Sequence, residues 1–197
     1  MPLPSPDTER LRMHQRNIKV DGFKRADGLW DIEARLVDAK DHDYPLSTGL
    51  RKPGEAVHDM SLRVTIDSTM TILEVVASTD AAPYMGACEA ILPDYSRIVG
   101  LNLFHGFLKA VKEMFGHTRG CTHVTELMMF LPTAALQTFA SEVLDNDEGE
   151  DKPFQLDRCH ALVSHSETVR RYYPRWYRDP GSGVSQTRQL TSSKEIA

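Results

Sequence analysis

The chain has 197 residues, of which 41% are hydrophobic and 26% are charged, and this composition is typical of a globular protein with one hydrophobic core. The formal net charge of -5 argues against a nucleic-acid-binding protein, because such proteins usually carry a basic face. No basic segment followed by an apolar one opens the chain, and no apolar run is long enough to span a bilayer, so we expect no membrane association. Three cysteines, an odd number, indicate reduced thiols and a cytoplasmic protein.

Changes in amino-acid composition along the chain predict an N-terminal arm, a folded domain and a C-terminal tail. Residues 1–16 are rich in proline and then charged, and we expect an N-terminal arm there. Residues 17–178 are expected to form a single α+β domain, and 179–197 a flexible C-terminal tail. Because apolar residues lie near both ends of the chain, we expect a homodimer.

Alternation of apolar and polar residues predicts four strands, at 17–25, 29–38, 56–67 and 70–78. The second segment alternates most clearly, with Trp30, Ile32, Ala34 and Leu36 on one face. The Asp-Gly pair before it is a strong signal for a hairpin turn. We therefore predict an antiparallel meander of four or five strands, apolar on one face.

Helical spacing of apolar residues predicts two main helices, over 95–115 and over about 121–144. An amphipathic sheet needs a covering layer, so both helices are expected to pack on its apolar face. One further extended segment is expected at 154–163, and a long loop at 38–55 is expected to lie near a functional site.

Side chains that can act in catalysis or bind metal are concentrated at 116–126, around the predicted start of the second helix. Cys121 stands at this helix N-terminus, where the helix dipole favours a thiolate, but we favour the interpretation of a small buried residue at a tight glycine turn. His123 and Glu126 are three residues apart and therefore neighbours on a helix, as an acid/base pair or as an ordinary surface pair.

The sheet offers a second group of candidates. His58 falls on the apolar face of its strand beside the long loop, which is a position for a structural histidine or for a base tuned near neutrality. Aromatic walls with a few polar groups are typical of small-molecule sites, and the residues that we expect to border such a pocket are Trp30, Met60, Tyr84, Arg25, Lys40 and Arg63.

Five short motifs occur in an order that resembles a bacterial family known as domain of unknown function 2889, at 25–33, 38–40, 54–60, 120–123 and 159–162. The resemblance spans residues 16–178. It implies a link to bacteria that degrade lignin-type aromatics, and with it a cofactor-independent lyase that releases a hydroxymethyl group as formaldehyde.

The first functional hypothesis is therefore an enzyme, a lyase acting on a phenolic aromatic substrate without metal or cofactor. Its expected catalytic residues are His58, His123, Tyr84 and Arg63. Its expected substrate-binding residues are Arg25, Trp30, Lys40, Met60, Cys121 and Glu126. Two alternatives stay open at this point: a metal- or iron-sulfur-binding protein that uses Cys121, Cys159 and nearby histidines, and a non-catalytic module that binds aromatic ligands.

Overall fold

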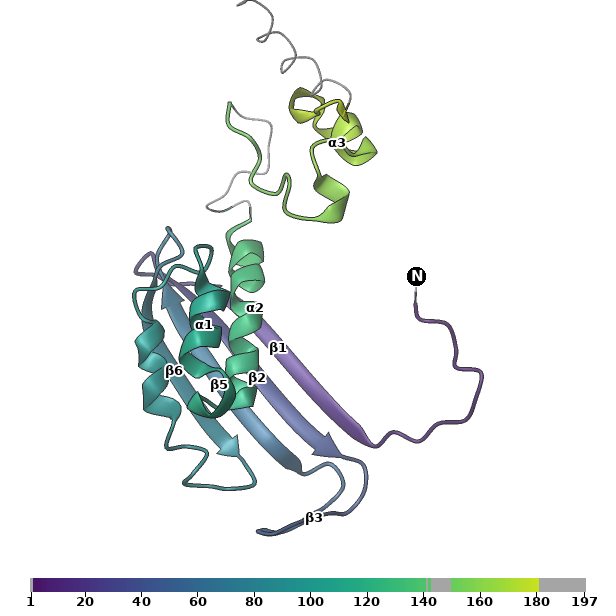
Figure 1. Cartoon of the computed structure of the whole chain (residues 1–197), viewed down its shortest axis with the longest axis vertical. Coiled ribbons are helices and arrows are strands. Elements are labelled where there is room, and N and C mark those ends of the chain that lie inside the picture. The colour runs from purple at the N-terminus through teal and green to yellow at the C-terminus, as the bar shows by residue number, and fades with distance from the viewer. Residues whose placement is uncertain (1, 141, 143–149, 181–197) are drawn as a thin grey trace, which may run out of the picture. The chain divides into compact units, whose positions relative to one another are not determined.

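A computed structural model describes residues 2–140, 142 and 150–180 of the chain, which divides into two compact units, Met1–Thr138 and Phe139–Ala197. The first unit contains the sheet and the two main helices (Figure 1). The second unit is short and built mainly from turns. The single domain expected over 17–178 stays a prediction.

The first unit is built on a four-stranded antiparallel sheet with the strand order β1-β2-β5-β6, which confirms the predicted meander. Its strands are β1 (His14–Lys24), β2 (Trp30–Lys40), β5 (Ala56–Ile66) and β6 (Ile72–Ala81). The long loop between the second and third of these holds a small hairpin of β3 (Tyr44–Leu46) and β4 (Gly49–Arg51).

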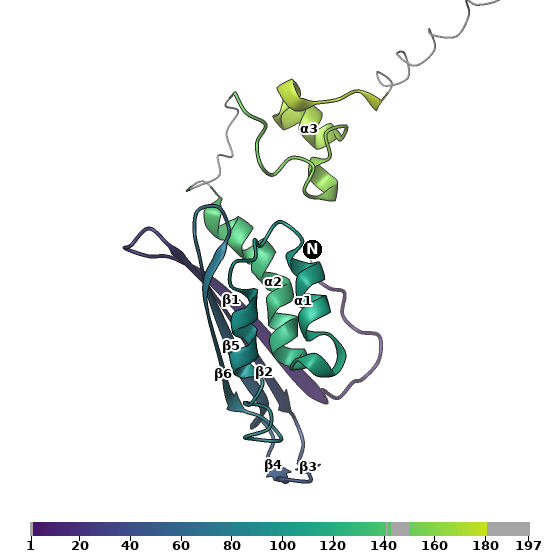
Figure 2. The same ribbon diagram turned by 60° about the vertical axis from the view of Figure 1, so that its left-hand side comes forward.

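Two helices, α1 (Phe107–Phe115) and α2 (Thr122–Phe139), lie on one face of this sheet (Figures 1 and 2). The single helix predicted over 95–115 is wrong. A 3-10 helix, η1 (Leu92–Ile98), comes first, and turns separate it from α1. Gly100 and Gly106 explain the break, because their φ angles of 86° and 73° are left-handed and incompatible with a continuous helix.

The core lies between the sheet and these helices. Alternate residues of β2 point into it, and the helices supply the opposing side chains. Its fully or almost fully buried members include Trp30, Ile32, Ala34, Leu36, Leu62, Val64, Val111, Phe115, Leu127 and Leu131. The same alternation continues to Asp38, which is only 3% exposed. A charged residue therefore ends the apolar row of β2.

The face of the sheet away from the core carries paired charges. Arg35 holds Asp59 with two hydrogen bonds of 2.8 and 2.6 Å, and Arg63 pairs with Glu33 at 3.5 Å. Such exposed pairs suit a solvated face and contribute little stability individually.

Close approach of β1 to α2 depends on Gly22. A Cβ atom added there would lie 1.8 Å from Thr138 Oγ1. We expect Gly22→Ala to lower the free energy of unfolding by about 1–3 kcal/mol through overpacking, measured by urea denaturation. The control Lys19→Ala, at an exposed position of the same strand, should stay within about 0.5 kcal/mol of wild type. Wild-type stability of Gly22→Ala would contradict this close packing.

The second unit contains η3 (His160–Leu162), α3 (Glu167–Tyr172) and η4 (Pro174–Trp176). The extended segment predicted at 154–163 is wrong, because turns and η3 occupy it. Ser166 caps α3 by accepting a hydrogen bond from the backbone N–H of Val169. Most of the predicted tail, from residue 181 on, lies outside the described residues. None of the helices in the described parts of the chain combines the length and hydrophobicity needed to cross a bilayer.

Candidate functional site

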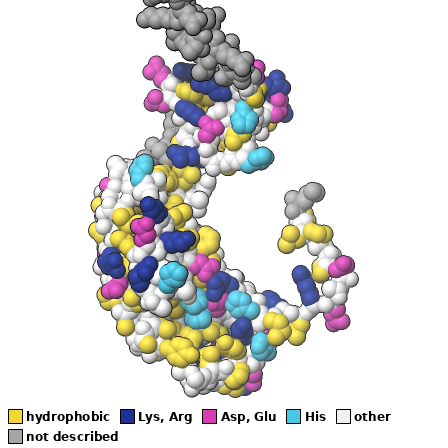
Figure 3. All heavy atoms as spheres, in the orientation of Figure 1, with side chains coloured by type: hydrophobic (Ala, Val, Ile, Leu, Met, Phe, Trp, Pro, Cys, Tyr) yellow, Lys and Arg dark blue, Asp and Glu magenta, His cyan; other side chains and the backbone are white. Residues whose placement is uncertain are grey.

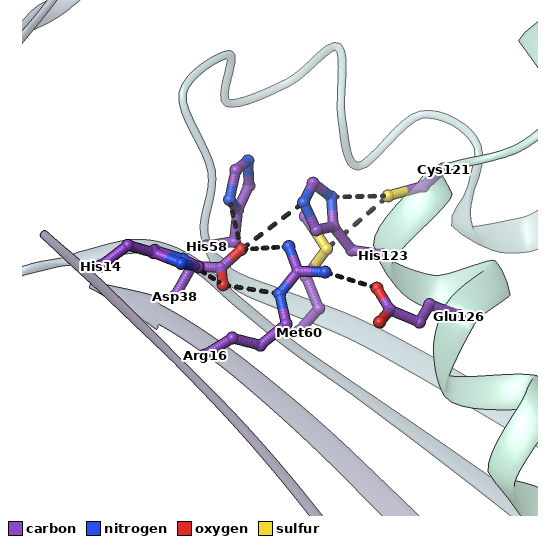
Figure 4. A network of polar contacts seen from close by, with 8 residues as sticks. All are labelled: His14, Arg16, Asp38, His58, Met60, Cys121, His123 and Glu126. Carbon is purple, nitrogen blue, oxygen red and sulfur yellow. Dashed lines mark hydrogen bonds and ion pairs between the residues drawn. The ribbon is translucent and has the colours of Figure 1, made fainter. Parts of the chain in front are cut away.

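The candidate site forms around Asp38 at the C-terminal end of β2. Antiparallel pairing places Arg16 of β1 directly opposite Asp38 on one side and His58 of β5 opposite it on the other. His14 lies two residues before Arg16 on β1, and His123 comes from the first turn of α2. We call Asp38, His14, Arg16, His58 and His123 the Asp38 cluster (Figure 4).

Three side chains hydrogen-bond the carboxylate of Asp38. Arg16 binds both oxygens, with Nε 2.8 Å from Oδ1 and a terminal nitrogen 2.8 Å from Oδ2. His14 Nε2 lies 3.0 Å from Oδ1, and His58 Nδ1 lies 3.1 Å from Oδ2. Burial alone raises the pKa of Asp38, but the hydrogen bonds from Arg16, His14 and His58 outweigh it and hold that pKa well below its usual range. Asp38 is therefore ionised at neutral pH.

An ionised carboxylate only accepts hydrogen bonds, and this fixes the tautomer of His58. Its Nδ1 faces Asp38 and must carry the proton. Its pKa is lowered, first by burial, against the opposing pull of Asp38, so the ring is neutral at neutral pH. The lone pair of His58 consequently stands on Nε2, on a side chain that is 20% exposed.

His123 packs against His58. The two rings are stacked, with centroids 3.8 Å apart and an angle of 30° between their planes. His123 Nε2 lies 3.6 Å from Asp38 Oδ2, while its Nδ1 lies 3.8 Å from Cys121 Sγ. Burial is the main cause that lowers the pKa of His123, and the neighbouring His58 lowers it further. Both stacked rings are thus neutral bases at neutral pH.

A buried tyrosine fixes the backbone that carries Cys121. Tyr95 is fully buried, and its hydroxyl accepts a hydrogen bond of 2.8 Å from the Cys121 N–H and donates one of 3.2 Å to the Cys121 carbonyl. On the other side, Cys121 Sγ lies 3.7 Å from Met60 Sδ, at the base of the site. Tyr95 therefore holds the start of α2, and with it His123, against β5.

We expect Tyr95→Phe to lower the free energy of unfolding by about 1–3 kcal/mol, because the N–H of the half-buried Cys121 loses its hydrogen-bond acceptor. Chemical denaturation measures this loss. Tyr84→Phe is the matched control, since Tyr84 is 55% exposed, and it should leave stability unchanged. Equal stability of the two variants would show that the Tyr95 hydroxyl does not anchor the helix start.

Glu126 completes the surroundings of the cluster. Arg16 donates a 2.6 Å hydrogen bond to Glu126 Oε2 and so bridges β1 and α2. Two carboxylates, Asp38 and Glu126, face the single guanidinium of Arg16, so the charges of these three side chains sum to -1. Figure 3 shows histidine side chains gathered on this face of the first unit, beside acidic and basic ones.

The structure brings five of the predicted site residues together: His58, His123, Met60, Cys121 and Glu126 (Figure 4). A sixth, Lys40, lies at the same end of β2, opposite His14 in the strand register. Its ammonium group lies 5.2 Å from the centre of the Tyr44 ring.

The other four predicted site residues lie apart from the cluster. Trp30 is eight residues earlier on β2 than Asp38, roughly 26 Å along the strand. Arg25 pairs with Asp27 and Asp31 near that distant end. Arg63 points to the charged open face, and Tyr84 is an exposed residue in the turns after β6. No hydrogen bond among the described residues joins any of these four to Asp38.

Sequence reasoning missed three members of the cluster: Asp38, His14 and Arg16. A signal for Asp38 was present, because it continues the period of two that buries Trp30 and Leu36, and a charged residue in such a row needs a buried partner. His14 and Arg16 fell in the predicted arm, before the predicted start of the first strand.

The sequence matches the model of one known protein family. Residues 14–137 match DUF2889, a family described as proteins of unknown function. The chain belongs to this family. The DUF2889 match starts at His14 and contains the entire Asp38 cluster, whereas the resemblance expected over 16–178 reaches further toward the C-terminus. Neither the curated proteins nor the solved structures contain a match to this chain.

Proposed function

We propose that this DUF2889 protein is a cofactor-independent carbon–carbon lyase that releases formaldehyde from a hydroxymethyl group on a phenolic aromatic substrate of the lignin-derived type. The observation that supports this is the pair of Asp38 and His58, in which the carboxylate binds Nδ1 at 3.1 Å and leaves Nε2 as an unprotonated base. Carboxylate–histidine pairs of this kind are a recurrent arrangement for general base catalysis.

In the proposed reaction, His58 Nε2 removes the proton from the hydroxyl of the substrate's hydroxymethyl group. The oxygen electrons form the carbonyl of formaldehyde while the bond between the hydroxymethyl carbon and its neighbour breaks. The electron pair of that bond stays on the neighbouring carbon, next to the ring, and this carbon then takes the proton back from His58. Hydroxymethyl substrate is thus converted into formaldehyde and a product with hydrogen in its place, with no oxidant or reductant.

The developing negative charge needs a cation or a hydrogen-bond donor. Arg16 is engaged by Asp38 and Glu126, and Arg25 and Arg63 pair with acids away from the cluster. In this proposal Lys40 is the cation that faces this developing charge, because it lies at the same end of β2 as Asp38. The stacked ring of His123 supports His58 in its orientation.

The proposal also keeps three expectations about the protein as a whole. The partner is a small aromatic molecule, and the protein acts as a homodimer in the cytoplasm. Gel filtration with light scattering measures the oligomeric state independently of any activity.

The test is turnover by the full chain after treatment with a chelator. Phenolic compounds with a hydroxymethyl side chain should release one formaldehyde per molecule consumed, and the co-product should lack the hydroxymethyl carbon by mass spectrometry. Matched phenols with a methyl group in its place should be inert. Tight binding of hydroxymethyl phenols without any product would overturn the lyase and favour a non-catalytic aromatic-binding module.

A further inference from the structure

Among the described residues, the ligand atoms of one carboxylate and two imidazoles converge in one place. These residues are Asp38, His58 and His123, and their ligand atoms all lie within 4.8 Å of one another. Asp38 Oδ2 is 3.1 Å from His58 Nδ1 and 3.6 Å from His123 Nε2. Ligands of a tetrahedral zinc ion, each about 2.05 Å from the metal, are about 3.3 Å apart, between these two separations.

The charge of the site also suits a divalent cation. Asp38 and Glu126 together outweigh Arg16 by one negative charge, and this excess attracts a divalent cation. Binding of one Zn²⁺ changes the summed charge of Asp38, Glu126 and Arg16 from -1 to +1. Two imidazoles and one carboxylate are a common set of protein ligands for zinc, with water as the fourth.

The neighbours of these three residues are placed as supporting groups. Arg16 and His14 hold the Asp38 carboxylate from the side of β1. Cys121 Sγ faces His123 Nδ1, the ring nitrogen that points away from Asp38, at 3.8 Å. Partners of this kind orient histidine and carboxylate ligands in metal sites. Cys121 is therefore a supporting residue of this site and not one of its ligands, unlike in the sequence-based zinc hypothesis.

We propose that Asp38 Oδ2, His58 Nδ1 and His123 Nε2 form an inhibitory site for Zn²⁺. Zinc takes the lone pair of His58 on Nδ1, so the proton of this ring moves to Nε2, which is the nitrogen that serves as base in the metal-free protein. Zinc binding and base catalysis by His58 are mutually exclusive because they need opposite tautomers. The inhibitory role rests on the proposed lyase function, while the binding site itself does not.

The binding test uses the chelator-treated full chain and Zn²⁺ alone. Isothermal titration calorimetry should show one Zn²⁺ per chain in a site that His58→Gln and His123→Gln each weaken by roughly 100-fold or more. His105→Gln, at an exposed histidine outside the cluster, should bind like wild type. Titration with Co²⁺ should give the absorption bands of tetrahedral cobalt. Unfolding curves of both glutamine variants establish that they fold.

The outcomes of these experiments separate this inference from the proposed function. Zinc binding that both glutamine variants weaken, together with loss of lyase turnover at saturating zinc, is the expected result. Absence of zinc binding, binding that neither variant weakens, or full turnover with zinc bound overturns the inference and leaves the lyase intact. Zinc binding at this site in a protein without any lyase turnover overturns the proposed function and retains the metal site.

Discussion

Asp38→Asn should lower the free energy of unfolding by about 3 kcal/mol, the low end of the range for breaking a buried ion pair. The carboxylate has only 5% of its side chain exposed and binds Arg16 through both oxygens. An amide in its place presents an N–H group to donors and leaves the guanidinium without its nearest charge. Arg16 is one-third exposed and keeps Glu126, which limits the loss. Urea denaturation measures the difference.

The structure offers a matched pair for comparison. Asp59 binds Arg35 with the same two-bond geometry, but on the open face of the sheet, where Arg35 is 57% exposed. Asp59→Asn should therefore cost no more than about 1 kcal/mol. Similar losses for Asp38→Asn and Asp59→Asn would contradict the special position of the Asp38 carboxylate.

His58→Gln should lower lyase turnover by about 10²–10⁴-fold, the usual contribution of a general base. Glutamine keeps a hydrogen-bond donor for Asp38 but has no basic nitrogen to replace His58 Nε2. Substrate binding is expected to change little, so the loss appears in kcat with KM nearly unchanged. Steady-state formaldehyde release measures both quantities.

His14→Gln is the comparison for this variant. His14 also hydrogen-bonds Asp38, through Oδ1, but it is more exposed than His58 and is not stacked on His123. We expect His14→Gln to lower turnover only about fivefold, which corresponds to the free energy of one hydrogen bond. Equal losses in His14→Gln and His58→Gln would show that both act only by holding Asp38, and that His58 is not the base.

The sheet could be predicted from the sequence because its strands carry local information. Alternation from Trp30 to Leu36 marks the buried face of β2, and the Asp-Gly turn before it marks the hairpin. The helix predicted over 95–115 failed because its apolar spacing is helical while Gly100 and Gly106 have left-handed φ angles. Glycine allows both conformations, so only the tertiary structure decides between them.

The site could be predicted only in part. His58 and His123 were found from residue type and predicted position, but their stacking depends on where α2 crosses β5, and no local pattern encodes that crossing. Arg25 and Arg63 were assigned to the site because cations suit a phenolate, yet both are neutralised by nearby acids. Pairing of β1 with β2, which brings Arg16 to Asp38, joins residues that are 22 positions apart.

Asp38 holds His58 as the Nδ1–H tautomer, with Nε2 free to act as base. Long-range ¹H–¹⁵N correlation spectra of the chelator-treated protein, labelled with ¹⁵N-histidine, report which ring nitrogen carries the proton. His58→Gln identifies the signals of this ring by their disappearance. We predict a neutral His58 ring at neutral pH, protonated at Nδ1. A ring protonated at Nε2, or at both nitrogens, would show that Asp38 does not hold His58 in this tautomer.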